Sequence, residues 1–238
     1  FYSAYAARKL GVNTAIIGHI GVDDEETVLP FLHEMGISDI NVKRVPGPIT
    51  RYFLEQVDEI LPLRATTFKN SCLIEIDKVK VNPNVLLCYP YPSLDYYLEQ
   101  YPESLKGIDV QYDIDIILDL KLINDVDVIF ISSSDVCKKT NKSLNEVIEF
   151  FFNKGVKIVV AKFGPGGSSI YQNGLERIDI PAFKSDYHWT VGAGDIYNAV
   201  FLLDYFKTQD LIHAGRFASM AAAEFIEQFE FDNKPWKY

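Results

Sequence analysis

The sequence predicts a doubly wound α/β fold built on a mostly parallel sheet. Apolar runs of strand length alternate along the chain with segments that have helical spacing. One run, residues 156–160, is apolar at almost every position, which is typical of a strand buried on both faces of a parallel sheet. Together these two observations predict a sheet covered by helices.

The individual elements follow from the same patterns. Gly36 and Gly155 stand where two helical patterns stop. The residues between the helical segments are mainly apolar and β-branched, as in strands. Strands are predicted over residues 14–17, 85–88, 126–131 and 156–160, and helices over residues 25–35, 144–153, 192–206 and 211–228.

Residues 41–78 break this alternation and are rich in β-forming residues. Strand-like runs at residues 51–57 and 72–76 flank a polar loop. We interpret the segment as a small β lid within one domain that spans residues 1–238, and we expect that an exposed lid could pair with its copy in a homodimer.

Composition narrows the class of ligand. The chain has 238 residues, 48% of them hydrophobic, which suits one sizeable core. Its formal charge of -10 argues against a nucleic-acid partner and favours a small molecule. No apolar run reaches the roughly 20 residues of a membrane span, and the first residues lack the pattern of a signal peptide, so we expect neither. Cys72, Cys88 and Cys137 have spacings that suggest neither disulfides nor zinc, so we expect a reducing cytoplasm.

The most specific local pattern is the series Thr-Val-Gly-Ala-Gly-Asp at residues 190–195, which leads directly into a helical run. Glycines let the backbone approach a ligand, and the first turn of a helix directs N–H groups and a positive dipole end toward it. Gly192, Ala193 and Gly194 are therefore predicted to form an anion hole. Asp195 fits a base that takes a proton from an attacking hydroxyl. The alternative is a tight loop, with Asp195 favoured only by the helix dipole.

A glycine-rich turn follows the apolar strand, from Lys162 to Ser169. Such turns at the carboxyl ends of parallel strands are where nucleotides bind in open α/β sheets. The spacing matches neither a P-loop nor a Rossmann fingerprint. An oxidoreductase would need a helix directly after this turn, whereas residues 168–171 have a strand-like pattern.

Two other groups of polar residues have simpler interpretations. Asp109, Asp113, Asp115 and Asp119 are predicted to belong to a solvated face rather than to a metal site. The four histidines are far apart in the sequence, and His188 alone stands near the predicted catalytic loop.

The order of strand, KxGxxG turn, hairpin, TVGAGD series and helix resembles the carboxyl-terminal half of PfkB-type carbohydrate kinases. Residues 215–223 are similar to that family's Ala-rich helix beside adenine, and residues 10–13 and 17–24 to its LG…G.VG.D block. The resemblance covers nearly the whole chain. It implies a ribokinase-like three-layer α/β/α sandwich and ATP-dependent phosphorylation of a hydroxyl on a sugar, sugar derivative or nucleoside.

Roles can be carried over residue by residue from the resemblance. It implies that magnesium arrives on the nucleotide and that no protein side chain is a resident metal ligand. The implied roles are Asp195 as base; Gly192, Ala193 and Gly194 as anion hole; Lys162, Gly164 and Gly167 around the ATP phosphates and ribose; Ala218 and Ser219 near adenine; and Thr50 and Arg64 in the lid over the acceptor.

The chain also departs from the family pattern. The family's first strand, with an acceptor-binding Asp and a Gly-Gly pair, is expected before Phe1. Residues 132–137 replace the NxxE block that supports magnesium, with Asp135 as a substitute. Trp189 stands where ribokinase has an Asp that helps to hold a monovalent cation, so activation by potassium stays open. These departures leave an alternative, a catalytically weak relative that binds nucleotide or sugar as a sensor or subunit.

Overall fold

A computed structural model describes the chain at residues 1–48, 51–56, 63–68, 81–90, 94–110, 114–185 and 190–228. For residues 51–56 and 63–68 it describes the backbone alone.

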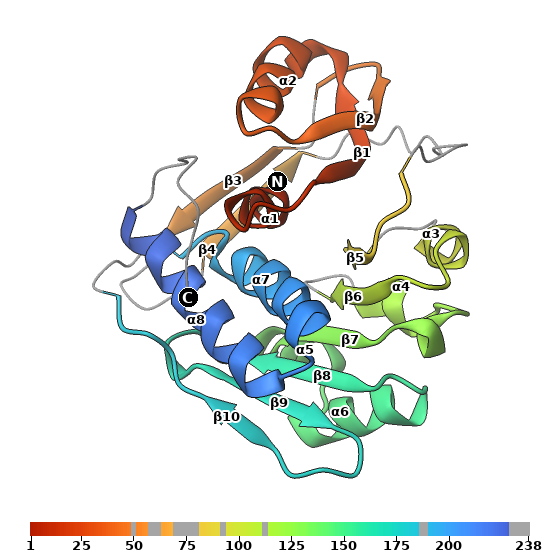
Figure 1. The fold of residues 1–238 in the computed structure, drawn as a ribbon, viewed down its shortest axis with the longest axis vertical. Coiled ribbons are helices and arrows are strands. Elements are labelled where there is room, and N and C mark those ends of the chain that lie inside the picture. Colours follow the sequence, from red (N-terminus) through yellow and green to blue (C-terminus); the bar gives the residue numbers. More distant parts are fainter. Residues whose placement is uncertain are drawn as a thin grey trace.

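A six-stranded sheet forms the centre of the molecule (Figure 1). Strands β5 to β8 are parallel to one another. At the other edge of the sheet, β9 pairs antiparallel with β8, and β10 pairs antiparallel with β9. In spatial order the strands are β10 (Ile178–Ile180), β9 (Ser168–Gln172), β8 (Ile158–Lys162), β7 (Val128–Ser132), β6 (Leu105–Asp109) and β5 (Val85–Cys88).

Helices cover both faces of this sheet (Figure 1). Along β7 the side chains of Val128 and Phe130 pack on one face, and those of Ile129 and Ile131 pack on the other. All four are fully buried, which confirms the predicted three-layer α/β/α sandwich. The first face carries α1 (Tyr2–Lys9), α7 (Ala193–Thr208) and α8 (Leu211–Gln228); the second carries α3 (Leu94–Gln100), α4 (Ile114–Leu118), α5 (Ser133–Thr140) and α6 (Leu144–Asn153).

Two smaller sheets come from the amino-terminal third. β1 (Ala15–Gly21) pairs in parallel with β2 (Ser38–Val45), and the connection contains η1 (Val22–Asp24) and α2 (Glu25–Glu34). β3 (Arg51–Gln56) pairs antiparallel with β4 (Leu63–Phe68). Within the described residues, β1 has no other strand partner than β2.

The structure corrects two details of the expected lid. Residues 41–45 belong to β2 and pair with β1, so they are not part of a separate β unit. β4 forms where the sequence analysis assigned a polar loop, because pairing with β3 outweighs the polar composition. The strand expected at residues 72–76 lies outside the described residues.

Three expected elements are confirmed at the predicted bounds, namely β5, α6 and α8. The start of α6 has a local cause: the hydroxyl of Ser143 accepts a hydrogen bond from the N–H of Glu146, whose carboxylate accepts one from the N–H of Ser143. The glycine-rich turn forms η3 (Gly164–Gly166) and continues into β9, so no helix follows it.

Helix α7 lies close to the central sheet because of a glycine on β6. A Cβ atom at Gly107 would come within 2.8 Å of a Leu202 methyl group and 3.1 Å of the Phe130 ring. Leu202 is fully buried in the core between helix and sheet. The missing side chain of Gly107 therefore sets how closely α7 approaches β6.

Candidate active site

The amino terminus of α7 is built by the predicted glycine loop. Gly192 precedes the helix with a φ of +87°, a conformation that favours glycine. A Cβ atom at Gly192 would lie 2.6 Å from the ring of Tyr2, so the loop also packs directly against α1. The N–H of Ala193 donates to the carbonyl of Thr190, at 3.1 Å. The amide groups of the following residues belong to the first helical turn, which lacks acceptors within the helix.

Asp195 lies in this first turn, and its carboxylate is held on one side only. The Tyr89 hydroxyl donates to Oδ1 of Asp195 at 2.8 Å. The Ser3 hydroxyl lies within hydrogen-bonding distance of the Tyr89 hydroxyl and of the backbone carbonyl of Asp195, the latter at 3.1 Å, and can donate its proton to either. Among the described residues no hydrogen bond reaches Oδ2. One carboxylate oxygen is therefore fixed and the other is open to a further donor.

The surroundings of Asp195 perturb its charge. Burial raises the pKa of this carboxyl above its ordinary value, and the nearby carboxylate of Asp109 raises it further. The hydrogen bond from Tyr89 and the ammonium of Lys162 act in the opposite direction. Burial, followed by the charge of Asp195, raises the pKa of the Tyr89 phenol far above its usual range. The phenol thus keeps its proton at neutral pH and acts as the donor.

A second polar cluster lies beside the glycine loop and comprises Lys162, Asp109 and Asn198, from β8, β6 and α7. Lys162 Nζ donates to Oδ1 of Asn198 at 2.9 Å and lies 3.4 Å from Oδ2 of Asp109. Asn198 Nδ2 donates to the same Asp109 oxygen at 2.6 Å. A Cβ atom at Gly194 would come within 3.4 Å of the Lys162 ammonium, so this cluster lies directly against the glycine loop.

Asp109 requires a correction of the sequence analysis, which assigned it to a solvated face. Its residue is 5% exposed, and it lies at the end of β6 against α7. Asp115 and Asp119 are exposed as expected, and Asp113 lies outside the described residues. The ends of parallel strands β6 and β8 meet at one edge of the sheet, which brings Asp109 to Lys162.

The glycines of the turn after β8 differ in their surroundings. Gly164 has a φ of +57°, and nothing among the described residues lies within 4 Å of the position of a Cβ atom. At Gly167 a Cβ atom would lie 2.2 Å from the carbonyl oxygen of Ile180, so this glycine is needed for packing on β10. Of the two, Gly164 leaves open space for a ligand.

The remaining predicted site residues are placed as follows. Ala218 belongs to α8 and is fully buried in the core. The Ser219 hydroxyl donates to the carbonyl of Pro181 at 3.1 Å and accepts from the N–H of Phe183 at 3.3 Å, which ties α8 to the segment after β10. Contact of these two residues with adenine stays a prediction. Thr50, His188 and Trp189 lie outside the described residues, and Arg64 is described by its backbone in β4 alone.

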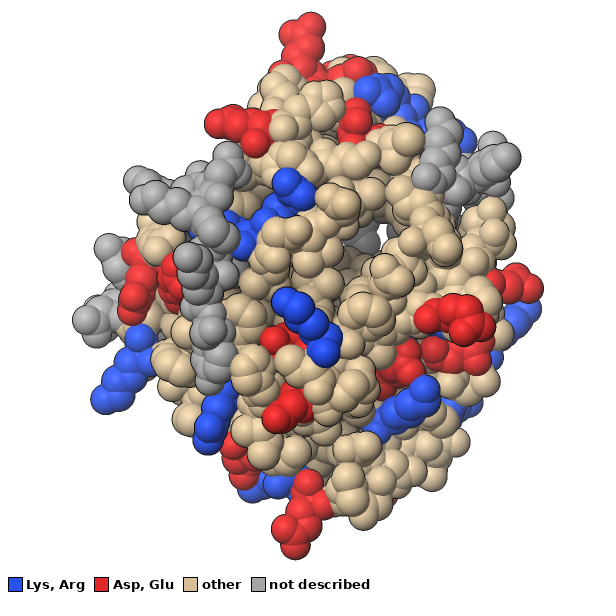
Figure 2. Space-filling model, viewed as in Figure 1, with Lys and Arg blue, Asp and Glu red and all other residues tan. Residues whose placement is uncertain are grey.

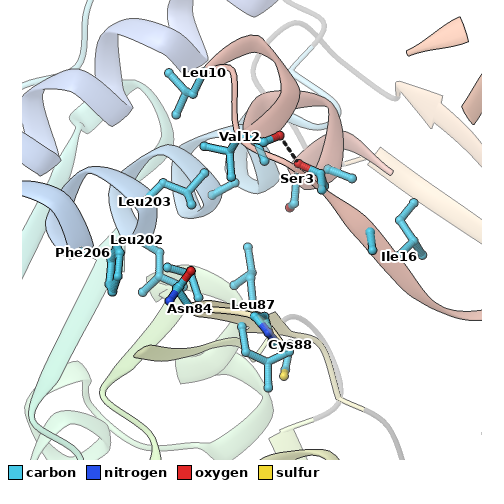
Figure 3. Close-up of a pocket in the computed structure, with 18 of the residues that line it drawn as sticks. Ser3, Leu10, Val12, Ile16, Asn84, Leu87, Cys88, Leu202, Leu203 and Phe206 are labelled. Carbon is cyan, nitrogen blue, oxygen red and sulfur yellow. Dashed lines mark hydrogen bonds between the residues drawn. The ribbon is translucent and has the colours of Figure 1, made fainter. Parts of the chain in front are cut away.

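A cavity of about 1490 Å³ lies beside this site, between α1 and β1 on one side and β5 and α7 on the other (Figure 3). Figure 2 shows the molecular surface hollowed on this face, with Lys and Arg scattered among Asp and Glu. The cavity wall is mainly apolar, with Ile16, Leu87 and Leu202 among its residues. Ser3 and Tyr89 line it, whereas Asp195 is not among the described lining residues.

Four residues of the site were missed as site residues by sequence reasoning, namely Ser3, Tyr89, Asp109 and Asn198. Asn198 alone carried a usable signal, because it follows Asp195 by three positions on one helix and so lies on a similar side. Tyr89 and Ser3 come from distant elements with no motif that links them to the loop.

Two properties of the described residues bear on metal binding and on membrane insertion. No group of three or more His, Cys, Asp or Glu side chains in this part of the chain is placed to hold a metal ion. None of its helices combines the length and the apolar character that a membrane crossing requires.

Sequence comparison shows which known proteins the chain resembles. The family model of pfkB family carbohydrate kinases matches residues 108–237. An uncharacterized sugar kinase of Archaeoglobus fulgidus is 26% identical over 253 residues, which cover 93% of this chain and 94% of that protein. A nucleoside kinase of Methanothermobacter thermautotrophicus is 36% identical over 93 residues, or 39% of this chain and 28% of that protein.

Solved structures support the same fold. The ribokinase of Cryptococcus neoformans in complex with ADP superimposes with a TM-score of 0.81 at 17% identity, covering 98% of this chain and 83% of the ribokinase. The family match extends over more than half of the residues and includes the glycine turn, the glycine loop and both carboxyl-terminal helices. The chain therefore belongs to the pfkB family of carbohydrate kinases and is a phosphotransferase of the carbohydrate and nucleoside kinase type.

Proposed function

We propose that this protein transfers the γ-phosphoryl group of ATP to a hydroxyl group of a sugar, a sugar derivative or a nucleoside, with Asp195 as the general base. The observation that carries the proposal is the one-sided hydrogen bonding of the Asp195 carboxylate at the amino terminus of α7. A base needs an oxygen within reach of the hydroxyl proton, and Oδ2 has no donor among the described residues.

The proposed reaction balances without further groups. The acceptor oxygen attacks the γ-phosphorus, its proton passes to Oδ2 of Asp195, and the bond between the γ-phosphorus and the bridging oxygen of ADP breaks. The raised pKa of Asp195 suits this role, because a base is most effective when its pKa approaches the working pH.

Charge on the transferring group is proposed to be stabilised by the glycine loop. The positive end of the α7 dipole and the N–H groups of its first turn favour an anion at Gly192, Ala193 and Gly194. Lys162 adds a cation in contact with the same loop. Phosphoryl transfer depends mainly on positioning and charge stabilisation. The glycine loop and Lys162 together would supply the charge stabilisation.

The nucleotide is proposed to bind along the glycine turn, where Gly164 leaves open space. Magnesium would come with ATP and neutralise charge on its phosphates. Asp135 would support it, since α5 begins directly after Ser132, which pairs with Lys162 across β7 and β8. Kinases of sugars and nucleosides among the relatives support the two acceptor classes.

The test is ADP release from magnesium ATP with a panel of sugars and nucleosides, for the unaltered protein and for Asp195→Asn. Acceptor-dependent release in the unaltered protein should fall at least about 10³-fold in Asp195→Asn, since the base is lost. Asp119→Asn, an exposed change of the same kind, should keep full turnover. Nucleotide binding with no acceptor-dependent release in any of the three proteins would favour the sensor alternative.

A further inference from the structure

We infer that Tyr89, supported by Ser3, is a positioning residue for Asp195, which holds one carboxylate oxygen so that the other faces the acceptor hydroxyl. The inference deepens the proposed function and rests on it. Tyr89 directly follows β5, Ser3 belongs to α1, and Asp195 lies in the first turn of α7. Three separate elements therefore meet at one carboxylate.

The direction of the hydrogen bond between Tyr89 and Asp195 is fixed by counting protons. Each hydroxyl carries one proton, and an ionised carboxylate can only accept. The Tyr89 proton therefore goes to Oδ1 of Asp195, at 2.8 Å. The Ser3 proton is left for the Tyr89 oxygen or for the Asp195 carbonyl, both within its reach. Ser3 thus links the phenol to the backbone of the residue that the phenol orients.

The residues that line the cavity give a second, independent reason to assign Tyr89 and Ser3 this role. Ser3 and Tyr89 line the cavity, but Asp195 is not among the described residues that do so. The Tyr89 hydroxyl thus reaches both the cavity and Oδ1 of Asp195. It occupies a hydrogen-bonding position on Oδ1 for which cavity water would otherwise compete.

Five ionisable groups act on Asp195 electrostatically or face it: Asp109 on β6, Lys162 on β8, Tyr2 on α1, Tyr89 after β5, and the α-amino group of Phe1, which favours the ionised carboxylate. Asp109 disfavours the ionised carboxylate, and burial does so more strongly. The Tyr89 hydrogen bond favours it. Loss of the phenol hydroxyl must therefore raise the pKa of the base, so that the base becomes active at a higher pH.

The experiment measures kcat/KM for the acceptor against pH in the unaltered protein, Tyr89→Phe, Ser3→Ala and Tyr96→Phe. Tyr96 is partly exposed on α3 and serves as the matched control. In Tyr89→Phe the acidic limb should move to higher pH, with kcat/KM lowered about tenfold on that limb and near the unaltered value above it. Ser3→Ala, which keeps the ring in place, should give a smaller shift in the same direction, and Tyr96→Phe none.

Several results would overturn the inference. A profile of Tyr89→Phe that is unchanged, or lowered equally at every pH, would contradict it, and so would faster turnover, which would mean that the phenol blocks the acceptor. If Tyr89→Phe does not fold, as judged by thermal unfolding, Ser3→Ala decides the matter by the same criterion. Failure of the proposed function is seen separately, as unaltered protein without acceptor-dependent turnover or as full turnover in Asp195→Asn.

Discussion

Asn198 and Asp109, 89 positions apart in the sequence, are joined by a hydrogen bond of 2.6 Å from Nδ2 to Oδ2. The other end of the same amide accepts from Lys162. One fully buried side chain thus holds a cation and a carboxylate in fixed positions beneath the glycine loop.

Replacement of Asn198 by Ala should be costly for stability. It removes both hydrogen bonds and leaves two charged groups in a poorly hydrated site, so we expect a loss of about 2–3 kcal/mol in the free energy of unfolding. Urea denaturation measures this quantity. Asn145→Ala, an exposed change on α6, should stay within about 0.5 kcal/mol of the unaltered protein. Equal midpoints for the two variants would mean that the cluster contributes little to stability.

Replacement of Gly192 by Ala tests the contact between α1 and the glycine loop. Gly174 also has a positive φ, +79°, but nothing lies near the position of its Cβ atom, so Gly174→Ala reports backbone strain alone, about 1–2 kcal/mol. At Gly192 the clash with the Tyr2 ring adds an overpacking term of about 1–3 kcal/mol. Thermal unfolding of both variants gives the difference. A Gly192→Ala protein as stable as Gly174→Ala would show that Tyr2 moves away freely.

Asp195→Asn is expected to stabilise the protein at neutral pH while it abolishes turnover. Burial raises the pKa of the folded-state carboxyl above its unfolded value, so the folded state binds more protons between these two pKa values. Stability contributed by this group is then present at low pH and lost as pH rises through the folded-state pKa. Removing the charge should raise the free energy of unfolding at pH 7.5 by about 1 kcal/mol.

The pH dependence of the free energy of unfolding tests whether this gain comes from removal of the buried charge. The gain of Asp195→Asn should disappear as the pH falls below the unfolded-state pKa, since the carboxyl is then neutral in both states. Chemical denaturation at several pH values from 3 to 8, with Asp119→Asn as the control, provides the comparison. A gain that is the same at every pH would point to packing instead of charge.

The sequence could predict those parts of the fold that depend on local patterns. The apolar run of β8, the helical pattern of α6 that stops at Gly155 and the Ala-rich pattern of α8 each lie within one segment and need no partner to be recognised. The glycine loop and Asp195 were found for the same reason, because the motif lies within six consecutive residues.

The missed features depend on which elements become neighbours in space. In the sequence, Asp109 is one of four nearby carboxylates, and only the arrangement of β6 against α7 buries it beside Lys162. Tyr89 became part of the site because the end of β5 meets α1 and α7. β4 formed from a polar segment because β3 supplied a pairing partner. Periodicity carries no information on such long-range pairings.

Gly107 affects the charged cluster although it touches none of its members. It stands two residues before Asp109 on β6, and Leu202 stands four residues after Asn198 on α7, so both pairs lie on the facing surfaces of strand and helix. A methyl group at Gly107 would act as a spacer between them. Apolar contacts tolerate a few tenths of an ångström, whereas the short bonds from Asn198 lengthen at once. The absent side chain of one core residue thus sets how far the Asn198 amide on α7 lies from Asp109 on β6 and Lys162 on β8 in the sheet layer.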